Sequence, residues 1–205
     1  MSVVVAYDAG MRSVLARCGL LALTLVPSIA LAQPPEQHAG MFLYGLSGGA
    51  GKRMTSGTFQ SPALPVTAGQ PPSDQTIGFL DLTAGMTAAG RLGLLALFEQ
   101  AGGADTSGGH WGTLGFHGVA RLWIAERVWI EGGFGSLNLA FRPPQQSGNN
   151  GVTRFWAGSP EAALGGAVFQ GKHVTIGVLA RYTTAMFDDL RVNHFSVQVE
   201  LMGRQ

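Results

Sequence analysis

The feature that most restricts the fold of this chain is a strict alternation of apolar and polar side chains near its C-terminus. The apolar members are Phe195, Val197, Val199 and Leu201, and the polar members between them are His194, Ser196, Gln198 and Glu200. Successive side chains of a β-strand point to opposite faces, so a two-residue period predicts a strand with one apolar and one polar face. The two faces of this strand must therefore meet different surroundings.

Similar segments recur from Met41 onward and predict eight strands joined by turns and loops. We expect the strands at 41–49, 76–86, 91–100, 113–124, 128–141, 155–169, 173–184 and 193–202. Their connections alternate in length: 50–75, 101–112, 142–154 and 185–192 are long, and 87–90, 125–127 and 170–172 are tight. This order predicts an all-β fold, an eight-stranded antiparallel up-and-down barrel with both termini at the end that carries the tight turns.

The charge content indicates what the apolar faces contact. Only 12% of the 205 residues are charged, whereas a soluble domain carries about 25%. No uninterrupted apolar run of about 20 residues lies outside the N-terminal region, which argues against a helical membrane span. Apolar residues spread over many strands, together with 31 glycines, favour a transmembrane barrel whose apolar faces contact lipid.

A soluble, lipocalin-like barrel is the alternative, because it shows the same alternation with its faces reversed. Such a barrel would have to solvate an outer surface with few charges and fill its interior from glycine- and alanine-rich strands. We therefore favour the membrane barrel. The net charge of +1 and the lack of a basic cluster predict no nucleic-acid partner.

The N-terminal region predicts export across a membrane. Arg12 and Arg17 precede an apolar stretch at 19–31, and Ala30-Leu31-Ala32 supplies small residues for cleavage. A membrane anchor that is never cut is the alternative. The predicted division of the chain is a signal peptide at 1–32, cleaved after Ala32, a periplasmic lead-in at 33–40 and an outer-membrane barrel at 41–205.

Two further features of the N-terminal region bear on this division. Met11 is an alternative start to Met1, since the segment before the apolar stretch is long. Cys18 is the only cysteine and precedes the apolar stretch. The mature chain therefore has neither a disulfide nor a thiol nucleophile.

We expect no catalytic residue, cofactor or metal. The five histidines show no metal-ligand spacing, and no local Ser–His motif supports a nucleophile and its base. Asp188, Asp189, His194 and His110 fall in or beside predicted loops, where solvated side chains are the simpler interpretation.

The segment Gly45–Lys52 has the glycine content of a phosphate-binding loop but not its spacing. Leu46 occupies the position of a required glycine, and Arg53 stands where Ser or Thr would bind magnesium. We interpret this segment as a strand that runs into a loop.

The polar faces of the predicted strands carry charges that would share the barrel interior. An eight-stranded barrel is only just wide enough for side chains to fill it, and unpaired buried ions are costly. We therefore predict a paired polar network in the lumen. Its members are Asp81, Arg91, Glu99, Arg121, Glu131, Glu161, Arg181 and Glu200. A plug of ion pairs is the favoured role, with a narrow polar path as the alternative.

The four tryptophans lie near the predicted ends of strands. Trp111 and Trp156 are near the ends with long loops, and Trp123 and Trp129 flank a tight turn, as expected for aromatic girdles. Strict alternation, however, points Trp123 and Trp129 inward. Either a bulge turns them outward or they close that mouth of the barrel.

With this layout, residues 41–202 resemble the small outer-membrane barrels that include the OmpA membrane domain, OmpX and OmpW. The resemblance rests on pattern and topology. It implies location in a bacterial outer membrane, contact with outer-membrane lipids and the outer-membrane assembly machinery, and a monomer. Members of this superfamily usually end on an aromatic residue, whereas Leu201 is followed here by Met202-Gly203-Arg204-Gln205.

The sequence therefore predicts a non-enzymatic outer-membrane barrel with a structural role or a role of its surface loops. A narrow channel for small or apolar solutes is the first alternative, and a membrane-embedded lipid hydrolase is a distant one. The three differ in measurable ways, since only the channel conducts steadily and only the hydrolase loses an activity when Ser or His is replaced.

Overall fold

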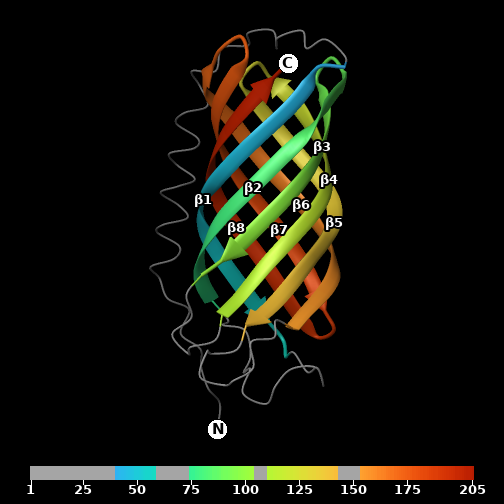
Figure 1. The fold of residues 1–205 in the computed structure, drawn as a ribbon, viewed down its shortest axis with the longest axis vertical. Helices are drawn as coiled ribbons and strands as arrows, with labels where there is room; N and C mark the ends of the chain where they lie inside the picture. The colour runs from blue at the N-terminus through green and yellow to red at the C-terminus, as the bar shows by residue number, and fades with distance from the viewer. Residues whose placement is uncertain (1–39, 59–73, 104–109, 143–152) are drawn as a thin grey trace. The chain divides into compact units, whose positions relative to one another are not determined.

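A computed structural model describes residues 40–58, 74–103, 110–142 and 153–205, which form a closed barrel of eight antiparallel strands (Figure 1). The strands are β1 (Phe42–Ser56), β2 (Asp74–Ala89), β3 (Leu92–Gly102), β4 (His110–Ala125), β5 (Val128–Arg142), β6 (Thr153–Gln170), β7 (Val174–Phe187) and β8 (Leu190–Arg204). Each strand pairs with the next in sequence, and β8 returns to pair with β1. The predicted fold class is confirmed as an eight-stranded antiparallel up-and-down barrel.

The predicted signal peptide at 1–32, and the lead-in apart from residue 40, lie outside the described residues. Across the described residues we find no helix with the length and apolar character that a membrane span requires.

The two ends of the barrel differ in their connections. At one end, here named the turn end, residues 90–91, 126–127 and 171–173 join β2–β3, β4–β5 and β6–β7. The C-terminus lies at the same end (Figure 1), where Phe42 and Gln205 exchange two backbone hydrogen bonds of 3.0 Å. At the opposite end, the loop end, β7 turns into β8, and β1, β3 and β5 end where β2, β4 and β6 begin.

Strand β1 is longer than predicted and continues to Ser56 instead of ending at residue 49. The reason is the close approach of β8. A Cβ atom at Gly49 or Gly51 would overlap the backbone carbonyl of Val197 or Phe195. Glycine, which suggests a loop in the sequence, is here what lets two neighbouring backbones approach.

The predicted loop at 185–192 is also wrong, because β7 and β8 are joined by a two-residue turn, Asp188-Asp189. Phe187 pairs with Leu190 across this turn. Asp188 has a φ of 50°, a left-handed conformation that aspartate tolerates better than most residues. The apolar residues on either side of the turn are buried and hold it against the loop end.

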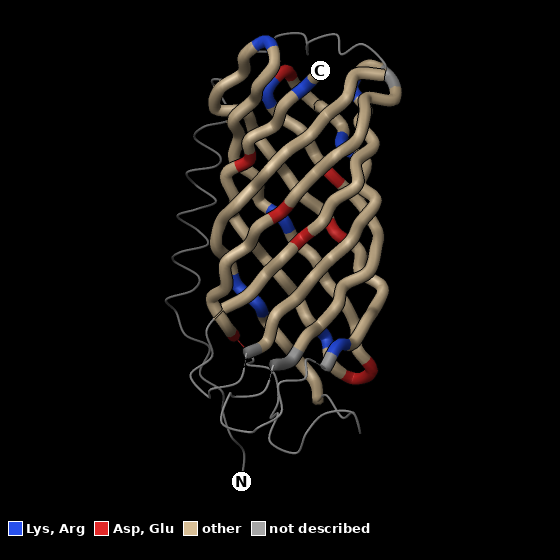
Figure 2. The backbone as a smooth tube through the Cα atoms, in the orientation of Figure 1, with Lys and Arg blue, Asp and Glu red and all other residues tan. Residues whose placement is uncertain are grey.

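Side chains alternate between the inside and outside of the wall, as the sequence predicts. The exposed face is apolar at mid-height, with Phe116, Phe134, Leu164, Val197 and Val199 among its members. Charged residues lie at mid-height as well as at both ends (Figure 2), and those at mid-height are buried inside the barrel. The wall therefore separates an apolar exterior from a charged interior.

Along one stretch of the barrel wall, β6 and β7 are not paired by the regular backbone ladder. The recorded pairing of β6 with β7 ends at Glu161–Thr183, although β6 begins eight residues earlier, at Thr153. One more register step would bring Pro160 opposite Thr184, but proline has no N–H to donate. The carbonyl oxygen of Thr184 instead accepts a hydrogen bond of 2.9 Å from Ser159 Oγ.

We name this stretch the seam. It comprises residues 157–160 of β6 and 184–187 of β7, between which the described structure records no ladder pairing. Proline in a strand is generally restricted to edges and bulges. The position of Pro160 therefore accounts for where the ladder stops.

The seam predicts a change in amide hydrogen exchange. Pro160→Val supplies the missing N–H, so the amides of Gly158 and Met186 should exchange about fivefold more slowly, the factor that a net hydrogen bond of roughly 1 kcal/mol gives. The measurement is residue-resolved exchange on the folded barrel. Ala162→Val, on the same exposed face but within the ladder, is the control. Equal slowing in both variants would attribute the effect to valine itself and not to the restored N–H.

Candidate functional site

The barrel interior brings together seven of the eight residues predicted to form the polar network. Each lies on a different strand and is buried: Asp81 on β2, Glu99 on β3, Arg121 on β4, Glu131 on β5, Glu161 on β6, Arg181 on β7 and Glu200 on β8. The eighth prediction is wrong. Arg91 lies in the turn before β3 and is exposed, because the strand begins at Leu92 and not at residue 91.

Arg121 connects neighbouring and distant strands. Glu131 stands directly opposite it on β5, and its Oε1 accepts a hydrogen bond of 2.5 Å from Arg121 Nε. Glu200, on β8, accepts hydrogen bonds of 2.6 Å and 3.2 Å from Nη2 and Nη1. The guanidinium also lies 4.9 Å from the ring centroid of Trp129 and 5.9 Å from that of Trp123. Two carboxylates and two aromatic faces thus surround one buried cation.

Arg181 gathers the remaining acids of the network. It forms ion pairs with Asp81, with Glu131 at 3.0 Å and with Glu161 at 3.2 Å. Glu131 therefore bridges the two arginines. We name the connected group of Arg121, Arg181, Asp81, Glu131, Glu161 and Glu200 the ionic core.

Glu99 lies beside the ionic core with partners of its own. Its Oε1 lies 3.1 Å from His194 Nδ1, and its Oε2 accepts a hydrogen bond of 3.2 Å from Thr183 Oγ1. Asp81 stands directly opposite Glu99 in the β2–β3 register, an arrangement that is unfavourable for two like charges. Acids outnumber arginines at this level, so each arginine is shared among several carboxyl groups.

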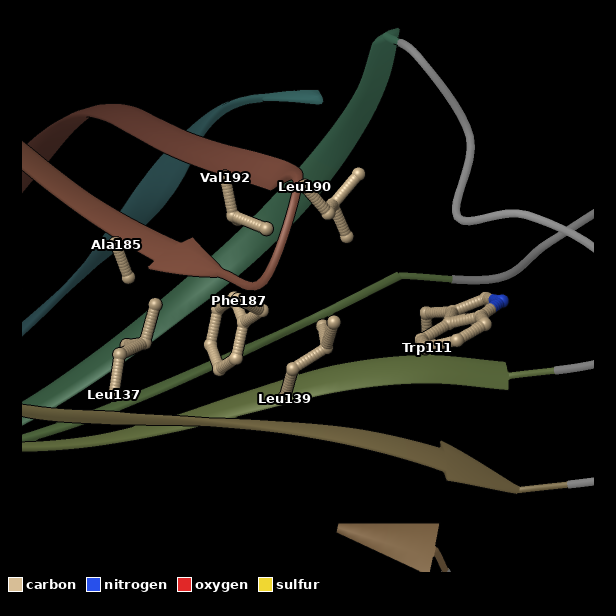
Figure 3. Packing of buried hydrophobic residues seen from close by; sticks show 7 residues of the cluster. All are labelled: Trp111, Leu137, Leu139, Ala185, Phe187, Leu190 and Val192. Atoms are coloured by element: carbon tan, nitrogen blue, oxygen red, sulfur yellow. The ribbon is translucent and has the colours of Figure 1, made fainter. Parts of the chain in front are cut away.

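Buried apolar side chains fill the lumen on both sides of the ionic core. The loop-end cluster consists of Trp111, Leu137, Leu139, Ala185, Phe187, Leu190 and Val192 (Figure 3). A smaller group near the same end consists of Ile77, Phe79 and Ala101. The turn-end cluster consists of Leu43, Leu95, Leu97, Val119, Trp123, Trp129 and Met202. Charged groups are thus enclosed between two apolar layers.

These clusters show whether each tryptophan points into the barrel or away from it. Trp123 and Trp129 point inward and close the turn end. Trp111 is also buried inside the barrel, so its predicted place in a girdle is wrong, whereas Trp156 is exposed.

The cavity at the turn end is small. Its volume is about 20 Å³, and its lining includes Arg121, Trp123, Trp129, Gln170 and Met202. This is room for about one water molecule. Among the described residues no group of three His, Cys, Asp or Glu side chains is arranged to hold a metal ion. The charged groups of the interior contact one another as ion pairs between strands.

Sequence reasoning missed one buried charge, Arg53, near the loop end of β1. The predicted strand stopped four residues before it. Continuing the inward parity of Ser47 through Gly49 and Gly51 would have placed Arg53 inside the barrel.

Comparisons with known proteins bear on the fold. No protein-family model and no curated protein matches this chain. Among solved structures, Neisserial surface protein A is 9% identical with a TM-score of 0.57, over 80% of this chain and 98% of that one. Ail, the attachment invasion locus protein of Yersinia pestis, is 14% identical with a TM-score of 0.56, over 80% and 99%, in a complex with the heparin analogue sucrose octasulfate.

The expected resemblance to small eight-stranded outer-membrane barrels is therefore confirmed at the level of the fold. At sequence identities this low, no functional residue of those proteins can be assigned to a position of this chain.

The ionic core predicts a large effect of removing one arginine. Arg121→Met leaves Glu131 and Glu200 without their main partner, and the free energy of unfolding should fall by roughly 3–5 kcal/mol. Urea unfolding of the barrel in lipid vesicles measures this change.

Two comparison variants define the origin of the effect. Arg191→Met removes an exposed arginine of β8 and should change the free energy by no more than about 0.5 kcal/mol. Glu200→Gln removes one of several acids and should cost less than Arg121→Met. Equal costs for Arg121→Met and Arg191→Met would show that the pairing contributes nothing to stability.

Proposed function

We propose that this chain is an exported, non-enzymatic barrel of a bacterial outer membrane, with a structural role or a role carried by its surface loops. The observation that carries the proposal is the layered lumen, in which apolar clusters enclose the ionic core on both sides. A charged interior closed in this way suits a wall that spans a membrane without conducting through it.

The exterior supports the placement in lipid. Large apolar side chains are exposed all round the wall, among them Val168 at 70% and Phe134 at 67%. A monomeric soluble protein seldom exposes a contiguous apolar patch of more than a few hundred Å². Exposed charges among the described residues lie toward both ends of the barrel, with Lys52, Asp74 and Arg191 toward the loop end and Arg127 and Lys172 at the turn end. An apolar band between polar rims matches the profile of a lipid bilayer.

The connections support an orientation. In outer-membrane barrels the short turns face the periplasm and the longer loops face outward. By this rule the turn end, where Phe42 meets Gln205, is periplasmic, and the loop end faces the cell exterior. A signal peptide cleaved after Ala32, lipids and the assembly machinery as partners, and a monomeric state belong to the same proposal.

The filled interior also favours this proposal over a channel. A continuous solute path would require both apolar clusters and the ionic core to move aside. The solved structure of Ail with a heparin analogue is one case in which a barrel of this fold binds a ligand.

Location and conductance test the proposal together. The protein should fractionate with outer membranes, and unboiled and boiled samples should migrate differently on a detergent gel, because a closed barrel offers few free strand edges to detergent. Planar-bilayer recording of the wild type should show no steady conductance. Recovery as a soluble periplasmic protein would refute the membrane location, and large steady currents would favour the channel.

The lipid-facing band gives a second, independent expectation. Val197 is exposed and lies at mid-height between Ala50 and Ala180. Val197→Arg should weaken insertion by about 2–4 kcal/mol near the bilayer midplane. Ser196→Ala, one residue away and facing inward, should be mild by comparison. Folding yield into vesicles distinguishes them, and the reverse order would mean that the two faces are exchanged.

A further inference from the structure

Arg53 occupies an unusual position among the charged residues of the barrel. It lies on β1 near the loop end, directly opposite Gln75 on β2 and His194 on β8. Its side chain points into the barrel and is 0% exposed. The preceding residue, Lys52, faces outward and forms an exposed ion pair of 2.9 Å with Asp74. Arg53 is therefore buried at a level where the outer surface is already polar.

The partners of Arg53 are neutral. Its Nη1 donates hydrogen bonds of 3.1 Å to Gln75 Oε1 and to the backbone oxygen of Trp111. In the described part of the chain Nε and Nη2 have no hydrogen-bond partner, and no carboxylate forms an ion pair with the guanidinium. A buried positive charge thus keeps two donors unused.

The other buried arginines provide the comparison. Arg121 meets two carboxylates and Arg181 meets three. Removing a guanidinium from water without a counter-charge costs several kcal/mol. The same fold therefore neutralises two of its buried arginines with its own acids and leaves Arg53 without one among the described residues.

The unused donors have the geometry of an anion site. Nε and Nη2 share one edge of the planar guanidinium, the edge that holds two oxygens of a carboxylate, phosphate or sulfate. His194, the cross-strand neighbour of Arg53, also has a buried Nε2 without a partner, and this nitrogen donates to an anion when the ring is protonated, because Nδ1 already faces Glu99. Ile77 and Phe79 lie on the adjacent strand and provide apolar surroundings, in which attraction between opposite charges is stronger than in water.

We propose that the loop end of the lumen binds a small tetrahedral oxyanion, a phosphate or sulfate group, on Nε and Nη2 of Arg53. The group is supplied either by a free inorganic anion or by a phosphorylated or sulfated sugar. The site requires the folded barrel but not the membrane role proposed above, so each proposal can fail without the other.

Phosphate titration of the folded barrel in neutral detergent tests the site. Sodium phosphate is compared with sodium chloride at equal ionic strength, which separates binding from screening. The Arg53 Nε–H resonance of the protein labelled with ¹⁵N-arginine should shift and saturate. At ten times Kd the ratio of folded to unfolded protein should rise about 11-fold, since stabilisation follows 1 + [L]/Kd.

Matched variants separate the site from a general effect of salt. Arg53→Met should abolish the phosphate dependence, whereas Lys52→Met removes one positive charge from the neighbouring residue and should retain it. Glucose 6-phosphate, with glucose as its control, tests the sugar source. A saturating response to it supports a sugar-borne group, and a response to inorganic phosphate alone supports the free anion.

Two results would overturn the proposal. One is an equal phosphate response of the wild type and Arg53→Met. The other is an Arg53 resonance that does not shift with phosphate. The second measurement needs only the wild type once its resonances are assigned, so it decides the question even if Arg53→Met does not fold.

Discussion

The interior depends on one interaction: acids from several strands share two buried guanidinium groups. The ionic core takes residues from β2, β4, β5, β6, β7 and β8, so it joins strands that have no backbone bond to one another. Buried ion pairs are weak evidence for stability, because desolvation offsets much of their attraction. They are more informative about register. A slip of one residue would turn the charge on that strand toward the exterior and its apolar residues toward the lumen.

The apolar clusters on both sides complete this arrangement. Trp129 contributes to the turn-end cluster and also lies against the Arg121 guanidinium, so one side chain both excludes water and contacts the charge. Excluding water strengthens the attraction within the ionic core and raises the cost of any group left unpaired. The same logic distinguishes Arg53, whose described contacts are with neutral oxygens only.

Local alternation was sufficient to predict most of the fold and seven of the eight residues of the predicted network. The period of two is a property of the strand itself, so it placed Arg121 and Glu200 inside without knowledge of their partners. The errors have tertiary causes. Gly49 and Gly51 belong to a strand because β8 approaches their backbone, and Trp111 is buried because the loop end is filled by Phe187, Leu190 and their neighbours. In both cases the contacting residues are distant in the sequence, so local patterns could not reveal them.

The seam makes the two ends of the barrel differ in how β6 and β7 are joined. From Glu161 toward the turn end the pairing of β6 with β7 continues to Gln170, with one register shift between Ala167 and Phe169. Toward the loop end the register between β6 and β7 stops, and Ser159 Oγ donates a hydrogen bond to the carbonyl oxygen of Thr184. The loop end therefore has one joint, between β6 and β7, at which the residue-by-residue register is not kept. Because Pro160 has no N–H, this joint has one backbone donor fewer than its neighbours, so it is where the loop end can widen most easily.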